Sequence, residues 1–331
     1  MPANRKKVLL PQNLAQAGWD LIGTRPDVEA ITYPPALSMP EFHRFLADVD
    51  GVALSFTPYS AAELAASPAM QVVARIGVGY DSVDVPALTA RKIPLMIAGT
   101  ANSASVAEHA LFVMLALAKR TTVLDPLVRA GGWHGRYADM PVDLAGRSVL
   151  VVGFGRIGTR LAARCLAMEM AVLVYDPYVA ADSIRAAGCE PAPDLDAALP
   201  RADFVTLHCP KKPDTLGMID ARRLALMRAG AFLVNTARGG IVDEKALAAA
   251  LSEKRLAGAG IDVFATEPVP EDNPLLSLSS VILSPHMAGV TKEATARSAV
   301  ATVGNILSVL DGRPNRENMV NPEVLDQSAI A

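Results

Sequence analysis

Short apolar runs alternate with helical patterns along most of the chain, and Gly, Pro or Asp residues separate them. Buried parallel strands are continuous apolar runs joined by helices that cover both faces of the sheet, so this alternation predicts an α/β fold. The candidate strands form two series, at 8–10, 28–33, 51–55, 72–76 and 95–98, and at 148–152, 172–175, 204–207, 232–235, 258–262 and 281–284. Two series of strands predict two lobes, the first with a helix at 60–66.

Two longer helical patterns flank the second series of strands. The first covers 104–117 and begins with Ser105-Val-Ala-Glu108, the spacing of a capping box, in which each side chain satisfies a backbone N–H of the first turn. The second covers 291–310 and ends at Asp311-Gly-Arg-Pro314, because Gly and Pro stop helices. We expect both helices to connect the two lobes.

Composition and charge narrow the class of protein. A length of 331 residues suggests two domains of roughly 150 residues each, and 51% apolar residues supply a core for both. A formal net charge of -3 provides no strong positive field that would attract nucleic acid or an anionic membrane. Small molecules are therefore the expected partners.

The expected location is the cytoplasm. Cys165, Cys189 and Cys209 are odd in number and lie outside any metal-ligand spacing, which is typical of reduced thiols and predicts no metal site. No apolar run approaches the roughly 20 residues that span a bilayer. The basic segment 1–7 precedes only three apolar residues before Pro11, so we expect no signal peptide.

A glycine-rich segment follows the first strand of the second series. Gly153-Phe-Gly155-Arg-Ile-Gly158 stands between that strand and a helical pattern at 159–168. In this context the first Gly permits a tight turn, the second lets a pyrophosphate approach the backbone, and the third packs helix on strand. The glycines alone also suit an ordinary strand-to-helix loop, but the strand and helix around them favour a dinucleotide site.

Asp176 indicates which dinucleotide binds. It follows the next strand, close to the spacing of about 20 residues at which a carboxylate accepts hydrogen bonds from the adenosine ribose. Pro177 and Tyr178 come next rather than Arg or Lys, so a 2′-phosphate would be repelled and NAD is favoured over NADP. Lys211 and Lys212 lie near the expected adenosine end, and we interpret both as solvated lysines.

Three later segments each place one chemically active residue beside the end of a candidate strand. They are Asn235-Thr-Ala-Arg238-Gly-Gly, Asp262-Val-Phe-Ala-Thr-Glu267-Pro and Ser284-Pro-His286-Met-Ala-Gly289. Sites in open α/β sheets lie at the carboxyl ends of the strands. Each of the three residues is by itself more often structural, and only the set predicts an active site.

With these segments, the sequence resembles the D-isomer-specific 2-hydroxyacid dehydrogenases, which include phosphoglycerate dehydrogenase, glycerate dehydrogenase and glyoxylate/hydroxypyruvate reductase. The resemblance spans nearly the whole chain and includes Arg75-Ile-Gly77-Val-Gly79-Tyr-Asp81-Ser-Val-Asp84. It implies two doubly wound parallel-sheet α/β domains of the Rossmann-like and flavodoxin-like kind, with the nucleotide-binding domain inserted into the substrate domain. The expected bounds are 1–103 with 290–331 for the substrate-binding domain, and 104–289 for the NAD-binding domain.

The resemblance implies a role for each catalytic candidate. Arg238 would hold the substrate carboxylate or the C2 oxygen, since a permanent cation orients and polarises such an anion. His286 would act as the general acid when a 2-oxo acid is reduced and as the general base in the reverse direction, because imidazole exchanges protons near neutral pH. Glu267 would pair with the imidazole and fix its orientation.

The same resemblance implies the binding residues. Backbone N–H groups of 76–79 would form an anion nest for the substrate carboxylate, although a plain glycine turn is the alternative. His109 and His208 match no catalytic motif, and for the chemistry we interpret both as structural. The expected substrate-binding residues are Arg75, Val78, Gly79, Arg238 and His286. The expected cofactor-binding residues are Gly153, Gly155, Arg156, Ile157, Gly158, Asp176, His208, Cys209, Pro210, Thr215, Thr236, Ala237 and Asp262, the last at the nicotinamide carboxamide.

Family members generally dimerise through the nucleotide-binding domain. The resemblance therefore implies a homodimer that uses the region 121–147, including Gly132-Trp133. The alternative for Trp133 is a local core anchor.

The expected substrate is a small 2-oxo or 2-hydroxy acid. Phosphoglycerate dehydrogenases usually present more cations in the substrate lobe, whereas Ser55-Phe-Thr57-Pro offers none, so hydroxypyruvate or glyoxylate is favoured. A short phosphoglycerate dehydrogenase is the first alternative. The chain ends soon after its last helix, so we expect no regulatory domain and no serine feedback.

Two further alternatives remain open at this stage. One is the oxidation of formate or phosphite within the same fold. The other belongs to a different class, an NADH-sensing binding protein similar to the corepressors of the C-terminal-binding-protein type. The complete set of Arg238, Glu267 and His286, without a basic region, favours an enzyme.

Overall fold

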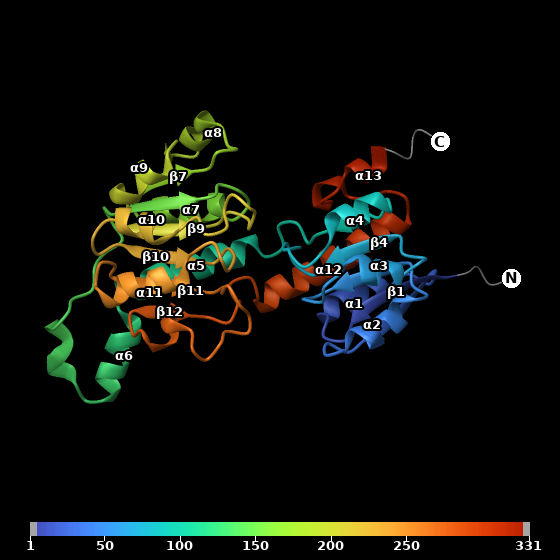
Figure 1. Cartoon of the computed structure of the whole chain (residues 1–331), viewed down its shortest axis with the longest axis horizontal. Coiled ribbons are helices and arrows are strands. Elements are labelled where there is room, and N and C mark those ends of the chain that lie inside the picture. The colour runs from blue at the N-terminus through green and yellow to red at the C-terminus, as the bar shows by residue number, and fades with distance from the viewer. Residues whose placement is uncertain (1–4, 327–331) are drawn as a thin grey trace. The chain divides into compact units, whose positions relative to one another are not determined.

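The chain folds into two units, one of which is inserted into the other. The computed structural model describes residues 5–326. The first unit contains the chain up to Asn102 and the segment from Thr291 onward, and the second unit is the intervening segment, Ser103–Val290 (Figure 1). The predicted α/β fold with an inserted unit is confirmed.

The first unit alternates strands and helices. Its elements are β1 (Lys6–Pro11), α1 (Gln16–Gly23), β2 (Val28–Tyr33), α2 (Met39–Leu46), β3 (Gly51–Leu54), α3 (Ala61–Ala65), β4 (Val72–Arg75), α4 (Val85–Ala90), β5 (Leu95–Met96), α12 (Lys292–Leu310), a 3₁₀ turn η4 (Arg316–Asn318) and α13 (Glu323–Asp326).

The sheet of this unit is buried on both faces. Its described strands run parallel in the order β2-β1-β3-β4-β5, which is the flavodoxin-like order. Val8 and Leu10 of β1 pack in a core with α1 and α12, whereas Leu9 packs in a second core with α2, α3 and α4. Successive side chains of a strand point to opposite faces, so a continuous apolar run suits this position.

The second unit also alternates strands and helices. Its elements are α5 (Ser103–Ala118), α6 (Thr121–Arg129), η1 (Trp133–Tyr137), β6 (Ser148–Val152), α7 (Gly158–Ala167), β7 (Ala171–Tyr175), α8 (Ala181–Ala186), β8 (Glu190–Pro191), α9 (Leu195–Ala198), η2 (Leu199–Arg201), β9 (Phe204–Leu207), α10 (Ala221–Leu226), β10 (Phe232–Asn235), α11 (Glu244–Ser252), β11 (Gly258–Ile261), η3 (Pro274–Ser277) and β12 (Val281–Leu283).

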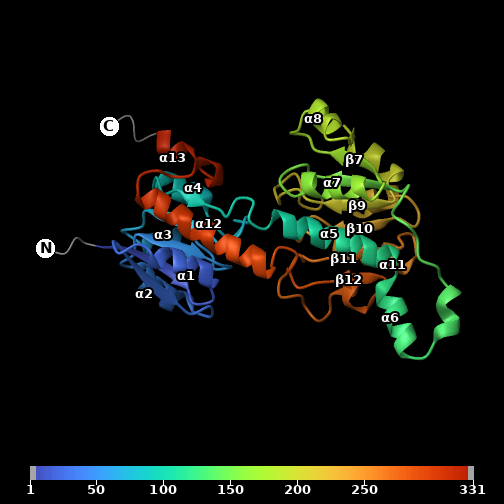
Figure 2. The same ribbon diagram turned by 180° about the vertical axis from the view of Figure 1, so that it is seen from behind.

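The sheet of the second unit has the Rossmann order. Its described strands run parallel in the order β12-β11-β10-β9-β6-β7-β8, so the chain reverses direction across the sheet between β6 and β9. Helices α5 and α7 cover one face and α10 and α11 cover the other (Figures 1 and 2). Ligands of such sheets bind at the carboxyl ends of the strands, at the point of reversal.

Each predicted strand is present, and the differences lie at the ends. The ranges 28–33, 148–152, 204–207 and 232–235 are confirmed at both bounds, whereas β3, β4, β5, β11 and β12 end one or two residues before their predicted bounds. The short strand β8 was not predicted, because Glu190-Pro191 has no apolar run.

One local prediction is wrong, and one alternative does not hold. Helix α5 begins at Ser103, so Ser105 lies buried inside its first turn and does not form the expected capping box. The Trp133 side chain is 58% exposed, so it is not a local core anchor. The end of α12 is confirmed, because Asp311 is its C-cap and Gly312 follows with φ +70°.

Between residues 5 and 326, no helix has both the length and the apolar composition needed to cross a membrane. The three cysteines are free thiols, and Cys165 and Cys189 are buried.

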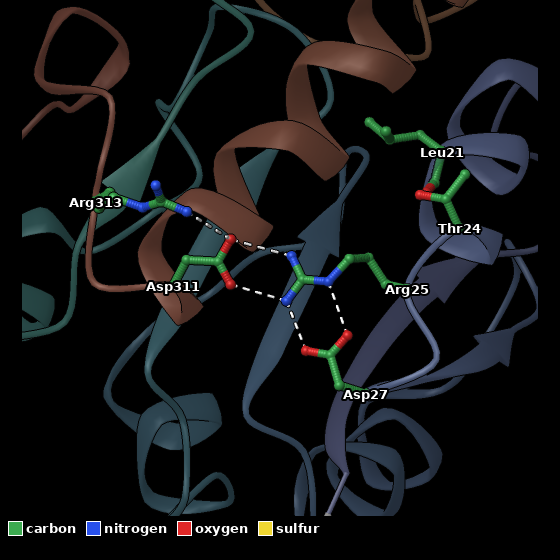
Figure 3. Close-up of polar contacts among 6 residues, drawn as sticks. All are labelled: Leu21, Thr24, Arg25, Asp27, Asp311 and Arg313. Atoms are coloured by element: carbon green, nitrogen blue, oxygen red, sulfur yellow. Dashed lines mark hydrogen bonds and ion pairs between the residues drawn. The ribbon is translucent and has the colours of Figure 1, made fainter.

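An ion-pair cluster joins the early and late parts of the first unit (Figure 3). The Arg25 guanidinium donates two hydrogen bonds to Asp27, at 2.8 and 2.6 Å, and two to Asp311, at 3.1 and 2.8 Å. The bonds from Arg25 hold the pKa of Asp27 at about 2. Asp311 caps the end of α12, so the cluster attaches that helix end to the loop after α1.

We expect the substitution Arg25→Leu to lower the melting temperature by about 2–4 °C, because it removes a bidentate network and keeps most of the apolar stem. The Asp27 pKa is depressed in the folded state, so its stabilising effect is present above its ordinary value of 3.8 and is lost as pH falls toward about 2. Thermal denaturation of both chains should therefore show a difference that shrinks at low pH and at high salt. A difference that is insensitive to both would assign the effect to packing.

Candidate active site

The glycine-rich loop joins β6 to α7 and is closely packed at two of its glycines. Gly153 has φ +97°, and a Cβ there would lie 2.7 Å from the Cys209 nitrogen. A Cβ at Gly158 would lie 2.0 Å from the Gly153 carbonyl oxygen. A Cβ at Gly155 would meet no atom within 4 Å. The loop is therefore tight at both ends and open in the middle, where a phosphate group can approach the backbone.

The Asp176 carboxylate lies beside this loop, directly after β7. Its Oδ2 accepts a hydrogen bond from the Phe154 backbone N–H over 2.7 Å, and its Oδ1 accepts from the Tyr178 N–H over 2.9 Å. These backbone donors fix the position of the carboxylate at the end of its strand.

A hollow at the ends of β6, β7 and β9 brings together many of the predicted cofactor residues. Its lining includes Gly153, Gly155, Asp176, His208, Cys209, Pro210 and Thr215. Tyr178 and Lys212 also line it, and the Lys212 ammonium lies 5.2 Å from the centre of the Tyr178 ring. Lys212 is exposed, yet it is more than the solvated lysine that we expected, because it stacks on an aromatic ring at the hollow.

Burial sets the protonation state of His208 and Cys209 at the base of the hollow. It lowers the pKa of His208 to about 3, so the imidazole is neutral. His208 Nε2 lies 2.9 Å from Thr206 Oγ1, whereas Nδ1 is buried and has no partner in the described part of the chain. Burial also raises the pKa of Cys209 to about 11, so this residue stays a thiol. Because buried polar atoms are normally paired, the orphan Nδ1 fits a position that a bound ligand would contact.

Arg238 lies on a tight loop after β10. The Asn235 side chain holds this loop, since its Oδ1 accepts from Ala237 N–H over 3.1 Å and its Nδ2 donates to the Arg238 carbonyl over 3.0 Å. A Cβ at Gly239 would lie 1.7 Å from the Phe264 carbonyl oxygen, so only glycine lets this loop approach the loop after β11.

The buried Asp262 carboxylate holds the loop after β12. Its Oδ1 accepts from Ser284 Oγ at 2.5 Å and from the Met287 N–H at 2.8 Å, and its Oδ2 accepts from the Ala288 N–H at 3.0 Å. The Asp262 carbonyl also accepts from the His286 N–H over 2.8 Å. One residue thus binds the backbone on both sides of the His286 side chain.

His286 and Glu267 form a hydrogen-bonded pair. His286 Nδ1 lies 2.8 Å from Glu267 Oε2, and Glu267 Oε1 accepts from the Phe264 N–H over 2.9 Å. Each side chain is about one third exposed, so the pair can meet a small molecule from solution. The His286 backbone has φ +55°, a left-handed conformation that is uncommon outside glycine and is held by the hydrogen bonds of the loop.

The structure places the predicted residues in three groups. The hollow collects the adenosine-side candidates, and Arg156 and Ile157 precede α7 beside it. The loops after β10, β11 and β12 collect Thr236, Ala237, Arg238, Asp262, Glu267 and His286. Arg75, Val78 and Gly79 belong to the first unit.

In the first unit, Arg75 is buried. Its guanidinium donates to the Gly79 carbonyl over 2.9 Å and to the Leu54 carbonyl over 3.3 Å. Gly77 has φ +127°, a conformation that only glycine adopts without strain, so the turn at 76–79 needs glycine at this position.

Some residues at the site were not predicted. Gly239 and Asn235 shape the Arg238 loop, Ser284 binds Asp262, and His109 contacts Ser284. The doublet Gly239-Gly240 was the one signal that marked a close backbone approach in the sequence. The other contacts join segments that are distant in the chain.

Comparison with protein families agrees with this geometry. A family model described as D-isomer specific 2-hydroxyacid dehydrogenase, NAD binding domain, matches residues 111–288. The matched residues lie inside the unit Ser103–Val290, which contains the glycine-rich loop and the Glu267–His286 pair.

Individual relatives and structures extend the comparison over the whole chain. The D-3-phosphoglycerate dehydrogenase of Mycobacterium leprae (strain TN) is 39% identical over 327 residues, which are 96% of this chain and 60% of the relative. A glyoxylate reductase from Paecilomyes thermophila superposes with a TM-score of 0.86 at 26% identity, covering 98% of this chain and 100% of that one. A D-lactate dehydrogenase from Aquifex aeolicus, complexed with NAD and lactic acid, superposes with a TM-score of 0.85 at 26% identity. The superposition covers 95% of this chain and 99% of that one. The chain spans between 49% and 60% of the length of the curated relatives that it matches.

The two glycines Gly155 and Gly158 should respond differently to alanine. We expect Gly158→Ala to lower the melting temperature by more than about 5 °C, because its Cβ would meet the Gly153 carbonyl, and Gly155→Ala to leave it nearly unchanged. Gly155→Ala should instead weaken NADH binding about tenfold or more, measured by fluorescence titration, because we expect the pyrophosphate to approach this backbone. Unchanged binding would place the phosphates elsewhere.

Proposed function

The chain belongs to the D-isomer-specific 2-hydroxyacid dehydrogenase family, and we propose that it transfers a hydride between NAD(H) and C2 of a small D-2-hydroxy or 2-oxo acid. The observation that carries the proposal is the Glu267–His286 hydrogen bond of 2.8 Å, in the same unit as the open glycine-rich loop. A general acid beside a dinucleotide site is what carbonyl reduction requires.

The residues of the second unit fit a dinucleotide. Gly155 leaves room at the backbone, and Asp176 offers a carboxylate at the end of β7. His208 Nδ1 and Thr236 Oγ1 are buried and lack partners within residues 5–326, as expected for groups that a ligand satisfies. With a dinucleotide bound, the Asp176 carboxylate would accept from the adenosine ribose hydroxyls and would repel a 2′-phosphate, so NAD is the preferred cofactor. We also propose that the first unit is the substrate-binding domain and that Arg75, Val78 and Gly79 bind substrate there.

The reaction uses three side chains of this unit. NADH, when bound, supplies the hydride that goes to C2 of the 2-oxo acid. His286 donates a proton to the C2 oxygen, so the carbonyl becomes an alcohol, and Glu267 stabilises and orients the imidazole. Arg238 holds the anionic end of the substrate, since its guanidinium stays charged. In the oxidative direction His286 takes the proton back.

Among possible substrates, we propose hydroxypyruvate or glyoxylate. The buried Arg75 guanidinium uses two of its N–H donors for the Gly79 and Leu54 carbonyls, which leaves fewer of them for a phosphate group. The segment that contains Phe56 and Thr57 adds no cation. A small acid without phosphate therefore suits these residues best.

Phosphohydroxypyruvate is the second candidate. It is favoured by one observation, the 39% identity over 327 residues to a protein named D-3-phosphoglycerate dehydrogenase. The two candidates differ by a doubly charged group, so the same assay separates them.

We expect the purified chain to oxidise NADH with one of these acids, and to use NADPH much less well. His286→Ala should lower kcat/KM by about 10²-fold or more, because it removes the general acid. Glu267→Gln should lower kcat/KM about tenfold, since the glutamine keeps the shape of the side chain and loses its negative charge. The assay compares glyoxylate, hydroxypyruvate, phosphohydroxypyruvate and larger 2-oxo acids under identical conditions.

The result ranks the alternatives. Preference for phosphohydroxypyruvate would favour the second candidate. If NADH binds with high affinity and no acid is reduced, the dehydrogenase proposal fails and an NADH-sensing binding protein becomes the better explanation.

We propose that the protein is a homodimer formed through α6, η1 and the neighbouring part of α5. None of the residues of α6 or η1 is buried, although both elements carry large apolar side chains. The exposed apolar residues are Phe112, Val123, Val128, Trp133, Tyr137 and Met140. A helix normally buries its apolar side, and a second copy of the same chain would supply the cover.

In light scattering, the wild-type chain should have twice the mass of one 34.8 kDa chain, and Val128→Asp with Trp133→Asp should have the mass of one. Charge in an apolar interface prevents association. Leu276→Asp, at another exposed apolar residue of the same unit, is the matched control and should stay dimeric. A double variant that stays dimeric would place the interface elsewhere.

A further inference from the structure

Helix α5 contacts the His286 loop through a chain of hydrogen bonds. His109 Nε2 lies 3.1 Å from Ser284 Oγ, and Ser284 Oγ lies 2.5 Å from Asp262 Oδ1. Asp262 in turn accepts from the backbone N–H groups of Met287 and Ala288. The chain of bonds runs from a helix on one face of the sheet to both sides of His286.

Proton accounting fixes the direction of these bonds. Three donors point at the two carboxylate oxygens of Asp262, so this group acts as the acceptor throughout. The Ser284 hydroxyl therefore donates its single proton to Asp262. Its oxygen can then only accept from His109, so the proton of that bond sits on His109 Nε2.

Burial makes the orientation of Asp262 sensitive to this support. Asp262 is 2% exposed, and a buried carboxylate depends on every donor that it has. Without the donor from His109, the Ser284 oxygen loses one of the two contacts that fix it, and its bond to Asp262 weakens. His109 is itself held, since its ring lies against Phe112 with centroids 6.1 Å apart.

We propose that His109 is a positioning residue, which through Ser284 keeps Asp262 oriented and so holds the loop that presents His286. The proposal rests on the proposed function, because it assigns His109 a part in orienting the general acid of that reaction. His109 acts through other residues and touches no reacting atom.

The experiment uses His109→Leu, His109→Gln, Ser284→Ala and the double variant His109→Leu/Ser284→Ala in the full chain. With the acid that the wild type reduces fastest, His109→Leu should lower kcat about tenfold or more and change the KM for NADH less than about threefold. His109→Gln keeps an N–H donor and should recover most of kcat. The double variant should match Ser284→Ala, because His109 acts only through Ser284.

Ser277→Ala is the matched control for Ser284→Ala, since the Ser277 hydroxyl donates to the Pro274 carbonyl of its own turn. It should leave kcat unchanged. If His109→Leu fails to fold, the loss in Ser284→Ala and the recovery in His109→Gln carry the test. Wild-type kcat in His109→Leu, or losses that multiply in the double variant, would overturn the proposal.

A second readout does not depend on activity. In NMR spectra of the chain labelled at histidine, the His286 signal should move in His109→Leu, and the signal of His43, which pairs with Glu63 in the first unit, should not. If the wild-type chain reduces no acid, the proposed function is refuted. The NMR comparison still tests whether His109 positions the His286 loop. An unmoved His286 signal would refute that role.

Discussion

Every described strand in the unit Ser103–Val290 runs parallel to its neighbours, and this common direction places the candidate functional residues at one edge of the sheet. Parallel strands need crossover connections, so the segment after each strand leaves the sheet at the same edge. Asp176, His208, Arg238, Asp262 and His286 all come shortly after strands. Residues up to 110 positions apart in the sequence, Asp176 and His286, therefore lie along the same edge of the sheet.

The loops at this edge hold one another in place. Gly239 admits the Phe264 carbonyl, the Phe264 N–H binds Glu267, and Asp262 binds the loop around His286. Two of these contacts pair the buried Phe264 N–H and the buried Asp262 carboxylate, which would be costly to leave unpaired. The orientation of the imidazole consequently depends on three loops together, and a change in one is expected to reach the others.

The strand order separates the two halves of the proposed site. The hollow lies at β6, β7 and β9, whereas the Arg238, Glu267 and His286 loops follow β10, β11 and β12 on the other side of β9. An elongated dinucleotide suits this arrangement, because its adenosine and its reacting end are recognised by different loops. Asp176 and Tyr178 line the hollow of the first half, and Asp262 holds the His286 loop of the second half by hydrogen bonds.

The sequence by itself determined the local structure. Apolar runs located the strands, and the spacing of Gly153, Gly155 and Gly158 identified the loop, because each is a property of neighbouring residues. Only the tertiary structure decided the partners: His109 lies 175 positions from Ser284, and Arg25 lies 286 positions from Asp311. No local periodicity encodes such pairs, because they depend on how helices and strands pack in space.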